Sequence, residues 1–90
     1  MPALSKKGLM RLRDRIFSEE EYDLLMEALK ASGFYNTNGA VNTIADYIDY
    51  KAYLLYEEFE DDYGHKIFME IVKEVTPKGT SYHIKEVNIE

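Results

Sequence analysis

Apolar residues recur at helical spacing near the start of the chain. Leu9, Leu12 and Ile16 are separated by three and four residues, and Ser5 precedes them at a position where it can cap a helix. We therefore expect a first helix over about residues 5–16. Lysine and arginine side chains occupy the rest of its surface.

A second helix is predicted over residues 18–32. Ser18 is a candidate N-cap, and Glu21 follows three residues later, which is the spacing of a capping box. The apolar stripe consists of Tyr22, Leu25, Met26 and Leu29. Gly33 then supplies a C-terminal stop, because glycine readily adopts the left-handed conformation that ends many helices.

The pattern over residues 43–62 fits two structures. As a helix, it places Ile44, Ile48, Ala52, Leu55 and Phe59 on one face and Asp46, Asp49, Tyr53, Glu57 and Glu60 on the other. As a strand over residues 52–60, it would pair with the next segment through a turn at residues 61–64. The strand puts Glu57 on the same face as Phe59, so we expect the helix.

The last third of the chain has the period of a β-hairpin. Residues 66–75 are rich in Ile, Phe, Met and Val, and Ile67, Met69 and Ile71 alternate there with Phe68, Glu70 and Val72. Residues 81–89 alternate again after a Thr-Pro-Lys-Gly turn, so the two segments form a hairpin. A further turn is expected at Asn36–Gly39, since asparagine and glycine tolerate positive φ. The prediction is a single α+β domain, residues 1–90, of three helices followed by an antiparallel hairpin. A three-stranded meander replaces the hairpin if residues 52–60 form a strand.

This predicted order of elements resembles a winged-helix DNA-binding domain. Residues 43–48, Thr-Ile-Ala-Asp-Tyr-Ile, and residues 64–67, Gly-His-Lys-Ile, are similar to the pattern in which a helix-turn-helix leads into a wing. The resemblance covers about residues 18–90 and implies a transcription regulator. Recognition in the major groove normally needs basic or amide side chains, whereas residues 43–62 are acidic. A regulator of this type would therefore use the basic first helix.

Charge is distributed unevenly along the chain. Residues 1–16 hold five basic side chains and one acidic one, while residues 17–90 hold six basic and sixteen acidic ones, for a net charge of −6. The basic side chains can pair with the acidic body or contact phosphate. The body itself repels nucleic acid and attracts basic surfaces, so we expect no tight binding to duplex DNA.

The acidic charge is concentrated between residues 46 and 63, where seven carboxylates and five tyrosines surround one lysine. Tyrosine supplies rigid contact area with a polar tip, and carboxylates match arginine and lysine on a partner. A row of carboxylates also imitates the charges of a phosphate backbone. The candidate binding residues are Asp46, Asp49, Tyr50, Tyr53, Glu57, Glu60 and Asp61. The alternative for this segment is a solvated face without a partner.

No motif for catalysis or for a cofactor is present. The chain has no cysteine, and its two histidines, His65 and His83, lack the spacing of a zinc site. The acidic residues lack the pattern of a calcium-binding loop, and neither a nucleophile elbow nor a glycine-rich phosphate loop occurs. We therefore expect neither a metal site nor a cofactor, and no enzymatic activity.

These features predict a small acidic binding protein, an inhibitor or adaptor whose partner is a basic protein. The sharpest form of this hypothesis is a mimic of nucleic acid that occupies the site of a nucleic-acid-binding protein, as inhibitors from phages and mobile elements do. The alternatives are the winged-helix regulator and a structural subunit. The lack of cysteine and of an apolar leader or span favours the cytoplasm. The oligomeric state stays open.

Overall fold

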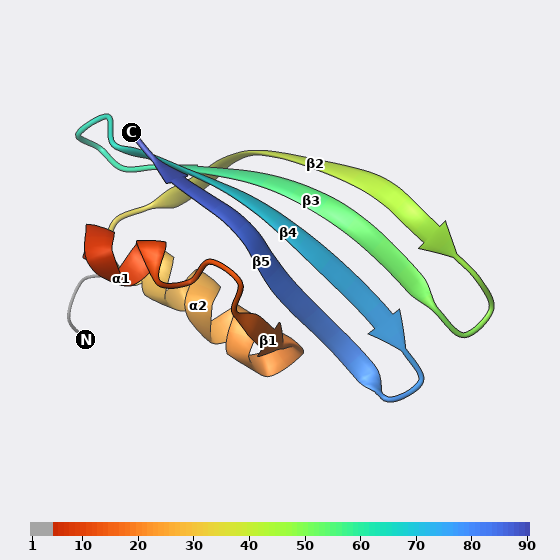
Figure 1. Ribbon diagram of the computed structural model, residues 1–90. Helices are drawn as coiled ribbons and strands as arrows, with labels where there is room; N and C mark the ends of the chain where they lie inside the picture. The colour runs from red at the N-terminus through yellow and green to blue at the C-terminus, as the bar shows by residue number, and fades with distance from the viewer. Residues whose placement is uncertain (1–4) are drawn as a thin grey trace.

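A computed structural model describes residues 5–90 as two helices and five strands (Figure 1). The elements, in chain order, are α1 (Lys6–Met10), β1 (Ile16–Ser18), α2 (Glu19–Ala31), β2 (Tyr35–Asp46), β3 (Lys51–Glu60), β4 (Lys66–Thr76) and β5 (Gly79–Ile89). The strands form one antiparallel sheet in the order β1-β5-β4-β3-β2. Both helices lie on the same side of this sheet (Figure 1). That side is called the helix face below, and the other side the open face.

The prediction of three helices followed by a hairpin, with its winged-helix resemblance, is wrong. The chain is mostly sheet, and the segment predicted as a third helix, residues 43–62, forms the end of β2, a hairpin turn and all of β3. The alternative prediction, a strand over residues 52–60, agrees with β3. Residues that are four apart lie on one face of a helix and also on one face of a strand, so the pattern fits both structures. Pairing on both sides of β3 selects the strand.

Two more local predictions need correction. Asn36–Gly39, predicted as a turn, lies inside β2, and the turn instead follows Asp46. The first helix ends at Met10 rather than at residue 16. Asp14 then adopts a positive φ of 64° and leads the chain into β1, so Ile16 is an exposed strand residue. The predicted cap of this helix is confirmed, because the Ser5 hydroxyl accepts a hydrogen bond from the Gly8 amide at 3.0 Å.

The predictions for α2 and for the C-terminal hairpin are confirmed. The Ser18 hydroxyl accepts from the Glu21 amide at 3.2 Å, and the Glu21 carboxylate accepts from the Ser18 amide at 2.9 Å. These two bonds form the capping box, and Gly33 follows the helix with a φ of 90°. Strands β4 and β5 pair from Thr76↔Gly79 to Ile67↔Ile89.

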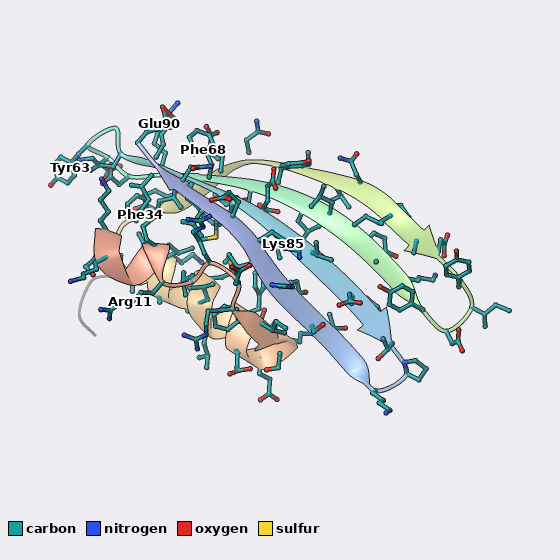
Figure 2. All side chains as sticks on the ribbon, viewed as in Figure 1. Arg11, Phe34, Tyr63, Phe68, Lys85 and Glu90 are labelled. Carbon is teal, nitrogen blue, oxygen red and sulfur yellow. The ribbon has the colours of Figure 1, made fainter. Side chains whose placement is uncertain are left out.

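The core lies between α2 and the middle of the sheet. Leu25 and Leu29 of α2 are buried against alternate residues of the three central strands. The fully buried sheet residues are Ile67, Met69, Ile71, Ile84 and Val87. Because successive side chains on a strand point to opposite faces, the intervening residues project from the open face. Figure 2 shows the two sides of the sheet, with Phe34, just before β2, on the side of the helices and Phe68 of β4 on the opposite side.

Candidate functional site

The structure does not bring the seven predicted binding residues together on one face. Asp46, Asp49 and Tyr50 lie at the hairpin between β2 and β3, while Glu60 and Asp61 lie at the opposite end of β3. The ten residues of β3 span roughly 30 Å at the rise of an extended strand. The predicted helical face therefore does not exist, because a strand separates residues that a helix would have stacked.

Several of these residues have partners within the chain at the hairpin end. Asp46 Oδ1 lies 3.6 Å from Lys51 Nζ, so the two form an ion pair across the hairpin. The Tyr50 hydroxyl donates a hydrogen bond to Glu74 Oε2 at 2.7 Å. This bond to a carboxylate is the main reason why the pKa of Tyr50 is raised. Asp49 lies exposed in the turn between the strands.

The middle of β3 directs two of the predicted residues toward the helix face. Tyr53 is half-buried against the core. Glu57 accepts a hydrogen bond from Asn36 Nδ2 at 2.8 Å, and it lies beside Gly39, where an added Cβ would stand only 3.1 Å from Glu57 Oε2. Burial, together with the nearby Glu57 carboxylate, raises the pKa of Tyr22 on α2. Tyr53 and Glu57 therefore interact with other residues of the chain on the helix face.

Asp61 organises the turn after β3. Its carboxylate accepts hydrogen bonds from the backbone amides of Tyr63 at 3.0 Å and His65 at 2.8 Å, and it lies 2.7 Å from the His65 ring. Loss of solvent around this side chain, which is 12% exposed, would raise the pKa of Asp61. The hydrogen bonds outweigh that effect and lower the pKa below its usual range. Of the seven residues, Glu60 is the one on the open face outside a turn.

The open face carries a different constellation, built from four strands. Two rows of residues cross it, and their members are paired strand to strand. One row is Ala40, Tyr56, Glu70 and Glu86, and the other is Asn38, Glu58, Phe68 and Asn88. These eight residues line a hollow of about 260 Å³. We call this hollow the acidic hollow.

Three carboxylates of the open face line this hollow, and they differ in their partners. Glu58 accepts a hydrogen bond from the Thr37 hydroxyl at 3.0 Å and lies 3.9 Å from Lys66 Nζ. Glu86 forms an ion pair with Arg13, whose Nε lies 3.1 Å from Glu86 Oε1. Glu70 has no ion-pair or hydrogen-bond partner in the described part of the chain. It lies directly opposite Glu86, so two like charges face each other on one side of the sheet.

Two aromatic rings complete the acidic hollow. Tyr56 is 39% exposed, and Phe68 is half-buried on the face away from the helices (Figure 2). Aromatic faces and carboxylates are the two kinds of group that bind an ammonium or a guanidinium. The acidic hollow is therefore suited to a cationic side chain with an apolar stem.

The prediction of binding residues missed Tyr56, Glu58, Phe68, Glu70, Glu86 and Asn88. One signal was present, because the alternation over residues 66–75 puts Phe68, Glu70 and Val72 on the face opposite Ile67, Met69 and Ile71. The pairing of β3 with β4 was part of the alternative prediction only, the strand over residues 52–60. Only this pairing joins the tyrosine of one strand to the glutamates of the next two.

The basic N-terminal residues are partly engaged within the chain. Arg13 pairs with Glu86, and the Arg15 guanidinium lies 5.6 Å from the centre of the Phe17 ring. His83, on the open face beside β1, lies 3.8 Å from Asp14 Oδ1, and its Nε2 has no hydrogen-bond partner within residues 5–90. Across the same residues, no three His, Asp or Glu side chains are grouped to hold a metal ion.

Comparisons with known proteins add no assignment, since no family model, curated protein or solved structure matches the chain. Within the described range, residues 5–90, neither helix has the length and apolar character needed to cross a bilayer.

Proposed function

We propose that this chain is a binding protein without enzymatic activity, and that it docks its open face on a basic surface of another protein. An arginine or lysine side chain of the partner enters the acidic hollow between Glu70 and Glu86. The observation that carries this proposal is the pair of facing glutamates, of which only Glu86 has a cation beside it among residues 5–90.

The free-energy argument rests on the cost of that pair. Like charges directly opposite each other on a sheet destabilise the fold by an amount on the order of 0.2–1 kcal/mol. A cation between the two carboxylates removes the repulsion and gains charge-assisted hydrogen bonds. Arg13 illustrates the fit, because its guanidinium contacts both oxygens of Glu86, at 3.1 Å and 3.4 Å. A partner cation would make the corresponding contacts with Glu70.

The aromatic rings support a partner with long basic side chains. Tyr56 and Phe68 offer apolar area to the methylene stem, while Glu58 adds a third carboxylate at the border of the hollow. Arginine fits this arrangement better than lysine does, since its planar guanidinium binds carboxylates in pairs and stacks on rings. We expect arginine at the centre of the partner's surface.

The class of partner follows from charge. A surface rich in arginine is typical of proteins that bind nucleic acid, so the acidic face supports the hypothesis of a nucleic-acid mimic that acts in the cytoplasm. The net charge of −6 opposes binding of the chain itself to duplex DNA. We expect duplex DNA to compete with this protein for the partner rather than to bind the protein.

A titration with a basic peptide tests the hollow directly. We would add a six-residue oligo-arginine peptide to the ¹⁵N-labelled protein and follow the backbone amide shifts. The largest shifts should occur at Tyr56, Phe68, Glu70 and Glu86, and they should shrink as salt is added. In the Glu70→Gln, Glu86→Gln variant the affinity should fall several-fold.

The matched control removes the same two charges elsewhere. Asp23 and Glu27 are exposed on α2, away from the hollow, so the Asp23→Asn, Glu27→Gln variant should bind the peptide nearly as well as the wild type does. Equal losses of peptide affinity in the two variants would mean that net charge alone determines binding, which would contradict the proposal.

A second experiment addresses the natural partner. Affinity capture from the native host, read by mass spectrometry, is compared for three proteins. They are the wild type, the Glu70→Gln, Glu86→Gln variant (the hollow variant) and the Asp23→Asn, Glu27→Gln variant (the α2 control). A specific partner should be retained by the wild type and the control and lost from the hollow variant. Release of that partner by duplex DNA would support mimicry. Retention by all three proteins would place the binding surface elsewhere.

A further inference from the structure

Strand β2 is a free edge of the sheet. It comes last in the strand order, and of its twelve residues all but Ala45 are exposed. Figure 1 shows that neither helix of the described residues covers it, since α1 and α2 lie toward the opposite edge. An uncovered edge strand presents unpaired amide and carbonyl groups, which form a template for pairing with another strand.

The usual protection of such an edge is missing from most of β2. The strand contains no proline, lysine or arginine, and its one charged residue is Asp46 at the end. The opposite edge is short and partly covered. Strand β1 has only three residues, Arg15 lies over Phe17, and the preceding chain continues the pairing through Asp14 and Arg15 to Ile84.

The regular part of β2 is short and well defined. Irregularities in its pairing with β3 occur between Asn36 and Asn38 and between Thr43 and Ala45. The first is held to β3 by the side chains of Asn36 and Thr37, which bond to Glu58. Residues 38–43 between them pair without interruption. Val41 lies in this run and is 62% exposed.

We propose that β2 pairs in antiparallel fashion with β2 of a second copy of this chain, with Val41 opposite the Val41 of that copy. Residues that face each other across an antiparallel pair lie on the same side of the sheet. A two-fold axis must therefore pass through one residue paired with its own counterpart. Val41 fits this position, because it lies near the middle of the regular run and its apolar side chain is larger than that of the neighbouring Ala40.

Charge favours a second copy over a basic partner at this edge. The chain carries a net charge of −6, so two copies repel each other over most of their surfaces. Residues 35–45 carry no charge, which makes this strand the long exposed element where two copies meet without opposing carboxylates. A basic partner gains nothing from an uncharged strand. Added salt should strengthen this pairing, whereas it should weaken docking on the acidic hollow.

The area of contact indicates a weak dimer. A strand of twelve residues is roughly 40 Å long, and a strip about 10 Å high along it gives on the order of 800 Å² in total from both copies. This lies below the ~1,200 Å² of stable complexes, so we expect an equilibrium between monomer and dimer at micromolar to millimolar concentration. The axis is normal to the sheet, so both open faces lie on the same side, and the dimer presents two acidic hollows to one partner.

Sedimentation velocity tests the equilibrium. The average mass of the wild type should rise above the 10.5 kDa of one chain as concentration increases, and it should rise further at high salt. Val41→Lys places two cations at the axis and should keep the protein monomeric, with an unchanged circular dichroism spectrum. The control, Leu24→Lys, changes a residue that is 67% exposed on α2 and should leave the equilibrium intact. A wild type that stays monomeric at millimolar concentration would overturn the proposal.

A cross-linking experiment fixes the register without disturbing the fold. The chain has no cysteine, so a single Val41→Cys substitution gives one thiol per copy. Directly opposed residues have Cα atoms about 4.5–5.5 Å apart, within the range of a disulfide. Mild oxidation should convert this variant to a covalent dimer faster than it converts Ile48→Cys, which is fully exposed at the hairpin tip. Equal rates would rule out the proposed register. Neither experiment changes a residue of the acidic hollow. A failure of the dimer proposal and a failure of the proposed function are therefore separate results.

Discussion

Glu70 of β4 lies directly opposite Glu86 of β5 on the open face. Arg13 forms an ion pair with Glu86 through two contacts with its carboxylate, while Glu70 has no cation beside it in the described part of the chain. The pair therefore combines a cost to the folded state with a site for a cation. Stability and binding should respond to this pair in opposite directions.

Replacement of Glu70 separates the two effects. Glu70→Gln removes the repulsion and should raise the free energy of unfolding by about 0.5 kcal/mol, while affinity for a basic peptide falls. Urea denaturation at low salt measures the stability, and the gain should shrink as salt screens the wild-type pair. Glu27→Gln on α2 is the control. A Glu70→Gln variant less stable than the wild type would show that the carboxylate has a favourable role in the monomer.

The capping box of α2 should contribute measurably to stability. Ser18→Ala removes the acceptor for the Glu21 amide and should lower the free energy of unfolding by about 1 kcal/mol. Urea denaturation of this variant beside the wild type gives the difference. Ser18→Asp preserves an acceptor at the cap and should recover most of the loss. If it does not, the effect lies in the short strand β1 rather than in the cap.

Acid should weaken the fold through Glu21 and Asp61. The pKa of Glu21 is lowered by hydrogen bonds from the Ser18 backbone and side chain, and that of Asp61 by its bonds to His65 and Tyr63, which outweigh desolvation. A carboxylate with a lowered folded-state pKa stabilises the fold above its unfolded-state pKa, here 4.5 for Glu21 and 3.8 for Asp61. This stability is lost as pH falls through the lower folded-state values.

Denaturation from pH 6 down to pH 2 would measure this loss. The Glu21→Gln, Asp61→Asn variant should show a shallower fall in unfolding free energy below about pH 4.5 than the wild type does. Parallel curves for the two proteins would assign acid sensitivity to other carboxylates.

Tyr53 should act on stability rather than on binding. Its ring is half-buried against the core on the helix face, so Tyr53→Ala should lower the free energy of unfolding by about 1–2 kcal/mol. Calorimetric melts give this value, and peptide titration of the folded variant should show nearly unchanged affinity. Tyr56→Ala, on the open face, should give the opposite result, with a small loss of stability and a clear loss of affinity. Equal effects of the two would mean that the two faces are not functionally distinct.

Local signals in the sequence were sufficient for two parts of the fold. The capping box of Ser18 and Glu21 and the stripe through Leu25 and Leu29 define α2, because a helix satisfies its hydrogen bonds within its own segment. The hairpin of β4 and β5 was equally predictable, since its two strands are joined by a four-residue turn and each alternates with period two. The acidic, tyrosine-rich character of the surface also follows from composition.

Tertiary structure decided the rest, because strands obtain their hydrogen bonds from other segments. Residues 43–62 have a spacing that fits a helix, and only the pairing of β3 with both β2 and β4 makes residues 51–60 a strand. That pairing tolerates Glu57 beside Phe59 on one face, since Asn36 donates a hydrogen bond to the carboxylate and Gly39 leaves room for it. It also assembles Tyr56, Glu70 and Glu86 from three strands. No local pattern predicts that these three residues lie close together. Their proximity depends on a strand register that is set by contacts between segments distant in the chain.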